Sequence, residues 1–227
     1  MIITLSHQKG GVGKSTLVWN LAIEYSKQRK VYVIDLDMQQ TFTQSLLIRH
    51  NNIKEGKLEK KLAKYSDNLN LIEIKDKEQL IQFLRTVKDD DLVFIDSGGF
   101  DSEYNRVAIM ASNLLITPVS SKFYELLGLK KYEAILYELS EDKELGREVK
   151  SVVVFNKINP TAKNIIREIF EFIKASKKFE NFNTVLRQRV DYENSPAMGL
   201  SVVEFSKHSK AAQEFLVFKK ELDDVVL

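Results

Sequence analysis

Short apolar segments alternate with longer amphipathic segments along most of the chain. Several apolar segments are continuous runs of Val, Ile and Leu, which is typical of strands buried on both faces of a sheet. The predicted strands cover residues 2–5, 31–34, 69–74, 92–95, 114–116 and 152–155, with a weaker one near 184–186. The predicted helices cover residues 15–28, about 40–50, 78–87, 102–111, 125–139, 161–174 and 207–222. This alternation predicts an α/β fold with a doubly wound, mainly parallel sheet and helices on both faces.

The composition is that of an ordinary globular domain. The 227 residues are 44% hydrophobic and 29% charged, with only 9 Gly and 3 Pro, so we expect one domain over residues 1–227. The chain shows no signal-peptide pattern, and no apolar run approaches the roughly 18–20 residues that span a bilayer. The absence of Cys excludes disulfides and Fe–S clusters. We therefore expect a cytoplasmic protein, while the net charge of +2 does not decide its partner.

The strongest chemical pattern lies between the first predicted strand and the first predicted helix, where residues 7–16 read HQKGGVGKST. Glycines let backbone N–H groups turn towards phosphates, and the helix that follows directs its positive end at the same anion. We expect Lys14 to contact the β- and γ-phosphates of ATP and the Ser15 hydroxyl to coordinate Mg²⁺. The predicted nucleotide-binding residues of this loop are Gly10, Gly11, Val12, Gly13, Lys14, Ser15 and Thr16.

Two later strands are predicted to end in carboxylates. Residues 35–40 read DLDMQQ and residues 96–99 read DSGG. The carboxyl ends of parallel strands meet at one edge of a sheet, so both segments would lie beside the loop. We expect Asp37 to position and deprotonate the attacking water and, with Ser15 and Asp96, to hold Mg²⁺. Asp35 would support the water shell of the metal. Capping of the next helix is the alternative role for either Asp35 or Asp37.

The sequence also suggests roles for one asparagine and three phenylalanines in its second half. Asn156 follows the strand predicted at residues 152–155, and its amide can donate to and accept from adenine. A helix cap is the alternative role for this residue. Three aromatic residues are expected to pack in the core rather than to stack on bases, namely Phe170, Phe172 and Phe179.

The segment from Lys9 to Thr16 resembles the deviant Walker A loop of the ParA/MinD group of P-loop ATPases. Gln8 stands where the usual pattern has its first glycine, and a second lysine, Lys9, precedes the glycines. Residues 35–40 resemble the D-x-D-P-Q segment of ParA-like ATPases, with Met38 in place of Pro and Gln40 in place of Gly. The resemblance extends to about residue 220. It is closest to the short plasmid-type ParA proteins without an N-terminal helix-turn-helix domain, because the loop begins within the first ten residues.

This resemblance implies an ATPase that converts ATP and water to ADP and phosphate in a nucleotide-sandwich homodimer. Lys9 would reach into the site of the neighbouring subunit, so Lys9, Lys14 and Asp37 are the expected catalytic residues. The ATP-bound dimer would bind DNA non-specifically and associate with the nucleoid. A ParB-like or ribbon-helix-helix centromere-binding protein would stimulate hydrolysis. The candidates for contacts with the DNA backbone are Arg187, Arg189, Lys207 and Lys210.

Two other functions stay open on the sequence alone. MinD proteins bind membranes through a basic amphipathic C-terminal helix, whereas residues 218–227 contain adjacent acids that would repel anionic lipid. No stable membrane association is therefore expected. The second alternative is a nucleotide-gated adaptor that positions another cellular assembly. Relatives of the nitrogenase iron protein are excluded because they need cluster-ligating cysteines.

Overall fold

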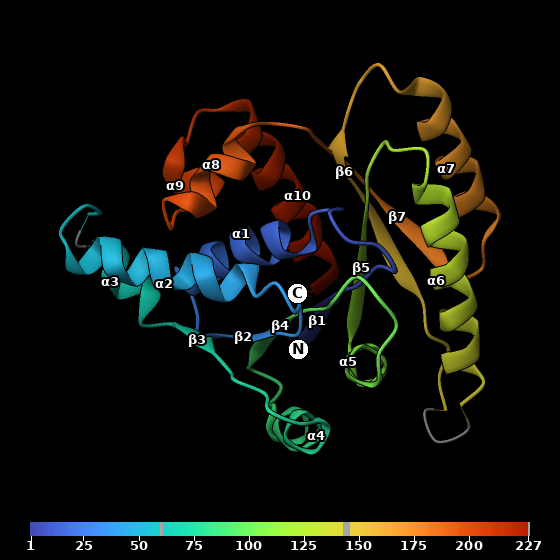
Figure 1. Ribbon diagram of the computed structural model, residues 1–227, viewed down its shortest axis with the longest axis horizontal. Coiled ribbons are helices and arrows are strands. Elements are labelled where there is room, and N and C mark those ends of the chain that lie inside the picture. The colour runs from blue at the N-terminus through green and yellow to red at the C-terminus, as the bar shows by residue number, and fades with distance from the viewer. Residues whose placement is uncertain (60, 143–145, 227) are drawn as a thin grey trace.

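The computed structural model of the protein describes residues 1–59, 61–142 and 146–226. Its centre is a seven-stranded sheet in the order β3-β2-β4-β1-β5-β6-β7, with parallel pairing throughout the described strands (Figure 1). The strands are β1 (Ile2–Leu5), β2 (Val31–Asp35), β3 (Leu69–Leu71), β4 (Leu92–Asp96), β5 (Leu114–Val119), β6 (Ser151–Ile158) and β7 (Phe179–Arg187). The chain builds outward from β1 in both directions, which confirms the doubly wound α/β fold.

Helices cover both faces of this sheet (Figure 1). One face carries α1 (Lys14–Ser26), α2 (Thr41–Lys54), α3 (Lys61–Ser66), α8 (Asp191–Ala197), α9 (Val202–Phe205) and α10 (Lys210–Val226). The other face carries α4 (Lys77–Thr86), α5 (Glu103–Ala111), α6 (Glu125–Ser140) and α7 (Lys163–Ala175). Every predicted helix is present, and the described chain adds three short ones, α3, α8 and α9, that periodicity did not indicate.

The central strands are apolar on both faces because alternate residues enter different cores. In β4, Leu92 and Phe94 join the core under α1 and α10, whereas Val93 and Ile95 join the core under α4 and α5. All four side chains are fully buried. Each position of such a strand therefore needs an apolar side chain, and this accounts for the continuous runs in the sequence.

The edge strand β7 is longer than its sequence indicated. It extends from Phe179 to Arg187, and buried residues such as Phe182 and Leu186 alternate with exposed ones. Its hydrophobic pattern is weaker because the exposed positions of this edge strand include polar residues. The buried side chains Phe215, Phe218 and Leu222 of α10 belong to the same core as Phe182 and Leu186. Among the described residues, no helix is long and apolar enough to cross a membrane.

Candidate nucleotide-binding site

The phosphate loop connects β1 to α1 and is shaped by Gly13. This residue has φ 94° and accepts the first hydrogen bond of α1, from Leu17 N at 3.0 Å. A Cβ at this position would also collide with Asn156 Nδ2. Left-handed backbone and close approach both require glycine here, so any side chain would distort the loop where it meets the helix.

Strand β6 supports the loop from behind. Asn156 Nδ2 donates to the Val12 carbonyl oxygen at 2.8 Å, and Lys157 Nζ donates to the Gly11 carbonyl oxygen at 3.3 Å. Asn156 and Val12 are both buried. The amide nitrogen of Asn156 is therefore engaged by the loop, and a contact with adenine stays a prediction. No sequence pattern had indicated a role for Lys157, which simply follows Asn156 at the strand end.

A hollow of about 430 Å³ opens over the loop and brings together the segments predicted to act on ATP. Six of the predicted nucleotide-binding residues line it, and so do Asp37, Gly99 and Lys157. The six are Gly10, Gly11, Gly13, Lys14, Ser15 and Thr16. A Cβ at Gly99 would lie 2.7 Å from Gly10 N, so the turn after β4 packs directly on the loop. The size and lining fit a nucleotide phosphate chain surrounded by backbone amides and cations.

Lys14 is a buried cation at the base of this hollow. Its side chain is almost wholly buried, and its Nζ donates to the carbonyl oxygen of Lys9 at 3.3 Å. Burial lowers the pKa of Lys14, while the negative charges of Asp96 and Asp37 oppose this shift. A buried ammonium needs anionic partners, and phosphate oxygens would provide them.

Asp96 at the end of β4 is the most strongly perturbed carboxylate of the site. It is fully buried, and neither of its oxygens has a hydrogen-bond partner among the described residues. Burial raises the pKa of Asp96 to about 8, with a further contribution from Asp35, while the nearby Ser15 hydroxyl and Lys14 oppose the shift. A buried carboxylate without partners is costly unless a cation compensates it.

The donor set beside Asp96 fits Mg²⁺. The hydroxyl of Ser15 and the carboxylates of Asp37 and Asp96 are hard oxygen ligands of the kind that this ion prefers. Within residues 1–59, 61–142 and 146–226, no group of three or more His, Cys, Asp or Glu is placed to hold a metal ion. The residues that would hold the ion are instead one hydroxyl and two carboxylates.

The two carboxylates at the end of β2, Asp35 within the strand and Asp37 after it, have different contacts. Asp35 Oδ2 accepts hydrogen bonds from Thr43 N at 3.1 Å and Thr43 Oγ1 at 2.9 Å. It therefore ties β2 to the first turn of α2, which corresponds to the capping alternative rather than to a role in the water shell. Asp37 lines the hollow, and its Oδ1 accepts from Gln39 N at 2.9 Å. Gln40 has φ 48°, so the position where ParA-like proteins often have Gly retains a left-handed conformation.

Lys9 pairs with a carboxylate of α6 instead of lining the hollow over the loop. Its Nζ donates to Glu125 Oε1 at 2.6 Å, and Glu125 is a fully buried residue at the start of α6. Lys9 is not one of the described residues that line the nucleotide hollow. The sequence did not point to Glu125, since a glutamate in the first turn of a helix is common and is usually solvated.

The four predicted DNA-binding residues fall into two pairs. Arg187 and Arg189 both form ion pairs with Glu214, at 3.2 Å and 2.6 Å. Lys207 and Lys210 are exposed near the start of α10 and form no ion pair within the described chain. The lysine pair therefore retains its full charge, whereas one glutamate partly neutralises the arginine pair.

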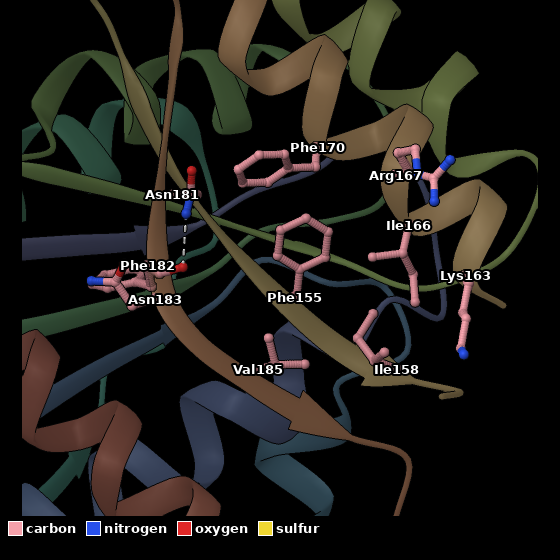
Figure 2. Close-up of a pocket in the computed structure, with 10 residues that line it drawn as sticks. All are labelled: Phe155, Ile158, Lys163, Ile166, Arg167, Phe170, Asn181, Phe182, Asn183 and Val185. Carbon is pink, nitrogen blue, oxygen red and sulfur yellow. Dashed lines mark hydrogen bonds between the residues drawn. The ribbon is translucent and has the colours of Figure 1, made fainter. Parts of the chain in front are cut away.

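A second hollow, of about 460 Å³, lies between α7 and β7 (Figure 2). Phe170 points into it and is 42% exposed, so the expectation that this residue belongs to the core was wrong. Phe179 is buried and Phe172 packs against the same core, as expected. None of the residues that line this hollow lines the nucleotide hollow, so the two are separate features.

Comparisons with known proteins agree with this geometry. The family described as ATPase MipZ matches residues 1–227. The chromosome partitioning protein ParA of Myxococcus xanthus is 23% identical over 248 residues, covering 97% of this chain and 87% of that protein. The septum site-determining protein MinD of Helicobacter pylori is 26% identical over 182 residues, covering 70% of this chain and 68% of that protein. A crystal structure of a plasmid partition protein from Borrelia burgdorferi bound to AMPPNP superimposes with a TM-score of 0.72 at 20% identity, covering 98% of each chain.

Proposed function

Because the chain belongs to the MipZ family of ATPases, we propose that it is a DNA-partitioning ATPase that works as an ATP-dependent homodimer. The observation that carries this proposal is the position of Lys9. This lysine lies on the phosphate loop, but its Nζ is bound to Glu125 and it does not line the hollow of its own subunit. A loop lysine that its own site does not use is available to a second subunit.

The residues of the site divide the reaction between them. Lys14 and the backbone N–H groups of the loop bind the phosphates, and Asp37 orients and deprotonates the attacking water. Bound Mg²⁺, held by Ser15, Asp37 and Asp96, would supply charge neutralisation at the phosphate oxygens. Lys9 of a second subunit would add positive charge where negative charge accumulates in the transition state, so hydrolysis would depend on dimerisation.

DNA binding by the dimer would use charge rather than base recognition. Lys207 and Lys210 are exposed and unpaired among the described residues, which suits contacts with the phosphate backbone. Arg187 and Arg189 would contribute less because Glu214 already binds both. The resemblance of the loop to ParA proteins also implies a centromere-binding partner, ParB-like or ribbon-helix-helix in type, through which the DNA cargo would be reached.

The dimer is tested by light scattering with a non-hydrolysable ATP analogue and Mg²⁺. We expect wild-type dimers with the analogue and monomers with ADP. Lys9→Ala should bind the analogue but stay monomeric or lose turnover, whereas Lys14→Ala should lose binding. Asp37→Ala should accumulate as an ATP-bound dimer. Dimers and normal turnover in Lys9→Ala would refute the role of this lysine in the partner's site.

DNA binding is tested with the analogue-bound dimer and a random duplex. The double variant of Lys207 and Lys210 to Ala should bind DNA more weakly. The slope of log affinity against log salt concentration should become less steep by about 0.9 for each phosphate contact that is lost. The double variant of Arg187 and Arg189 to Ala is the matched control and should bind more nearly like wild type. A salt-independent affinity would contradict backbone binding.

A MinD-like role at a membrane is the second candidate function, favoured by the similarity to H. pylori MinD. Here the side chains Phe218 and Leu222 of α10 are buried in the core instead of facing outward. Sedimentation with anionic lipid vesicles in ATP separates the two functions. Recovery with vesicles but not with DNA would replace the partition role by the membrane role.

A further inference from the structure

The contact between Lys9 and Glu125 affects how the protein can dimerise, an inference that rests on the proposed homodimer. Lys9 cannot remain on Glu125 and also reach the nucleotide of a second subunit. Its Nζ lies 2.6 Å from Glu125 Oε1, and the lysine side chain is 26% exposed while that of the glutamate is 1% exposed. Forming the dimer therefore means breaking a buried ion pair in each subunit, and the partner left behind is a carboxylate inside the protein.

Few groups can compensate Glu125 once Lys9 has left. Its Oε1 also accepts a hydrogen bond from Ser120 Oγ at 2.7 Å. Its Oε2 has no hydrogen-bond partner among the described residues, and His7 Nε2 lies 3.6 Å from it. Lys9 is the only lysine or arginine in ion-pair contact with Glu125 in the described chain. An unpaired carboxylate at this depth would be strongly destabilising.

His7 is placed to share that charge. It is fully buried, and neither ring nitrogen has a hydrogen-bond partner within the described part of the chain. Its ring stacks on Tyr132 with centroids 6.3 Å apart, and a Cβ at Gly128 would lie 2.7 Å from His7 Cε1. The ring is therefore held in one position against Glu125 by the packing of α6.

Burial, assisted by two neighbouring positive charges, keeps His7 neutral while Lys9 is in place. Burial lowers the pKa of His7 to about 3, and the positive charges of Lys14 and Lys9 contribute to the same shift. Within the described part of the chain, the titratable and charged groups that face the pair are Lys9 and Lys14 from the loop and Tyr132 from α6. Burial raises the pKa of Tyr132, so this residue stays neutral. Departure of Lys9 removes one of the two cations and leaves a single anion opposite the ring.

We propose that Glu125 anchors Lys9 within the monomer, and that transfer of Lys9 to the partner's nucleotide makes the Glu125–His7 pair take up one proton. The proton comes from solvent and binds either Nε2 of the histidine or Oε2 of the glutamate. Protonation of the histidine leaves a contact ion pair, and protonation of the glutamate leaves two neutral groups. Neither subunit then keeps a lone buried charge. Glu125 is thus a positioning residue that acts through Lys9.

Proton uptake makes dimerisation dependent on pH. One proton for each of two subunits would strengthen the dimer by up to about 100-fold for each unit by which the pH falls. Glu125→Gln keeps the shape and the oxygen acceptor for Lys9 and Ser120 but carries no charge. We expect its dimer to be at least about tenfold tighter than wild type at pH 8 and nearly independent of pH, because no buried ion pair has to be broken.

Calorimetry counts the protons directly. The wild type and Glu125→Gln are titrated with a non-hydrolysable ATP analogue and Mg²⁺ in two buffers of equal pH and different protonation enthalpy. We expect the wild type to take up about one proton per subunit more than the variant, and this difference to vanish with ADP. Glu138→Gln is the matched control, because this α6 glutamate is paired with Arg106 on the surface and should behave as wild type.

A second measurement needs no variant. Diluting the preformed wild-type dimer in the same two buffers should release about one proton per subunit as the subunits separate, while the nucleotide stays bound. This result keeps the inference testable even if Glu125→Gln does not fold. Zero protons on dilution, or equal uptake by the wild type and folded Glu125→Gln, would overturn the inference while leaving the dimer intact. Absence of a wild-type dimer would instead refute the proposed function.

Discussion

Asn156 Nδ2 donates a hydrogen bond to the Val12 carbonyl oxygen at 2.8 Å, so the end of β6 holds the phosphate loop in place. Asn156→Asp removes this donor and introduces a negative charge directly behind the loop that should receive phosphate. We expect nucleotide affinity to fall by about 10- to 100-fold, corresponding to roughly 1.5–3 kcal/mol. Fluorescence titration with a labelled ATP analogue measures this change.

The control for that variant is Asn164→Asp. Asn164 is exposed at the start of α7 and does not line the nucleotide hollow, so the same change in charge should leave nucleotide affinity within about twofold. If Asn156→Asp binds as tightly as this control, the loop does not depend on support from β6.

Gln40 offers a test of stability at the edge of the site. Its φ of 48° is a left-handed conformation that costs a non-glycine residue about 1–2 kcal/mol. Gln40→Gly should therefore raise the free energy of unfolding by about 0.5–1 kcal/mol once the extra backbone entropy of glycine is subtracted. Urea denaturation followed by circular dichroism is a sufficient measurement.

Gln39→Gly provides the comparison for Gln40→Gly. Gln39 is also exposed but does not have a positive φ, so glycine there should only add freedom to the unfolded chain and lower stability. Equal effects at the two positions would mean that the strain at Gln40 is not relieved by glycine.

The parts of the site that were predictable from the sequence are those in which a local pattern carries the chemistry. Lys14 and Ser15 belong to a glycine loop between a strand and a helix, and Asp37 and Asp96 follow apolar runs. In a parallel sheet these positions converge by topology, because all strand ends of one sense share an edge. The hollow over the loop confirms this convergence for Lys14, Ser15 and Asp37.

The contacts that were not predictable join residues far apart in sequence with no motif to link them. Glu125 binds Lys9 across 116 residues, and Glu214 binds Arg189 across 25. Each of these glutamates looks like an ordinary helix-surface residue in the sequence. Whether such a side chain is buried or solvated depends on how the helices pack, which periodicity alone does not determine.

The raised pKa of Asp96 makes the free energy of unfolding of the apoprotein depend on pH in a defined direction. Burial raises the pKa of this carboxyl to about 8 in the folded state, whereas the unfolded chain loses the same proton near pH 4. Between these values the folded state binds the extra proton, so stability falls as the pH rises. The slope for this group is at most about 1.4 kcal/mol per pH unit.

Asp96→Asn should remove this contribution because the amide does not ionise. Urea unfolding of nucleotide-free protein at pH 5.5 and 7.5 should show wild type losing stability relative to Asp96→Asn as the pH rises. Asp89→Asn, at an exposed position, should follow wild type across the same range. Parallel curves for wild type and Asp96→Asn would show that Asp96 is already ionised in the folded apoprotein.

Arg49 of α2 and Glu204 of α9 form a buried ion pair that joins these two helices. Arg49 Nη1 lies 2.7 Å from Glu204 Oε2, and both side chains are almost fully buried. Arg49 Nη1 also donates to the Gly199 carbonyl oxygen at 2.8 Å. Glu204→Ala would leave the guanidinium without its counter-charge and should cost about 3–5 kcal/mol in the free energy of unfolding.

The matched control is Glu55→Ala. Glu55 Oε2 lies 2.6 Å from Lys57 Nζ, but more than half of each side chain is exposed, so its loss should cost under about 1 kcal/mol. Because the two pairs have similar lengths, the difference between the variants measures the effect of burial. A cost for Glu204→Ala as small as that for Glu55→Ala would mean that water reaches Arg49 once the carboxylate is removed.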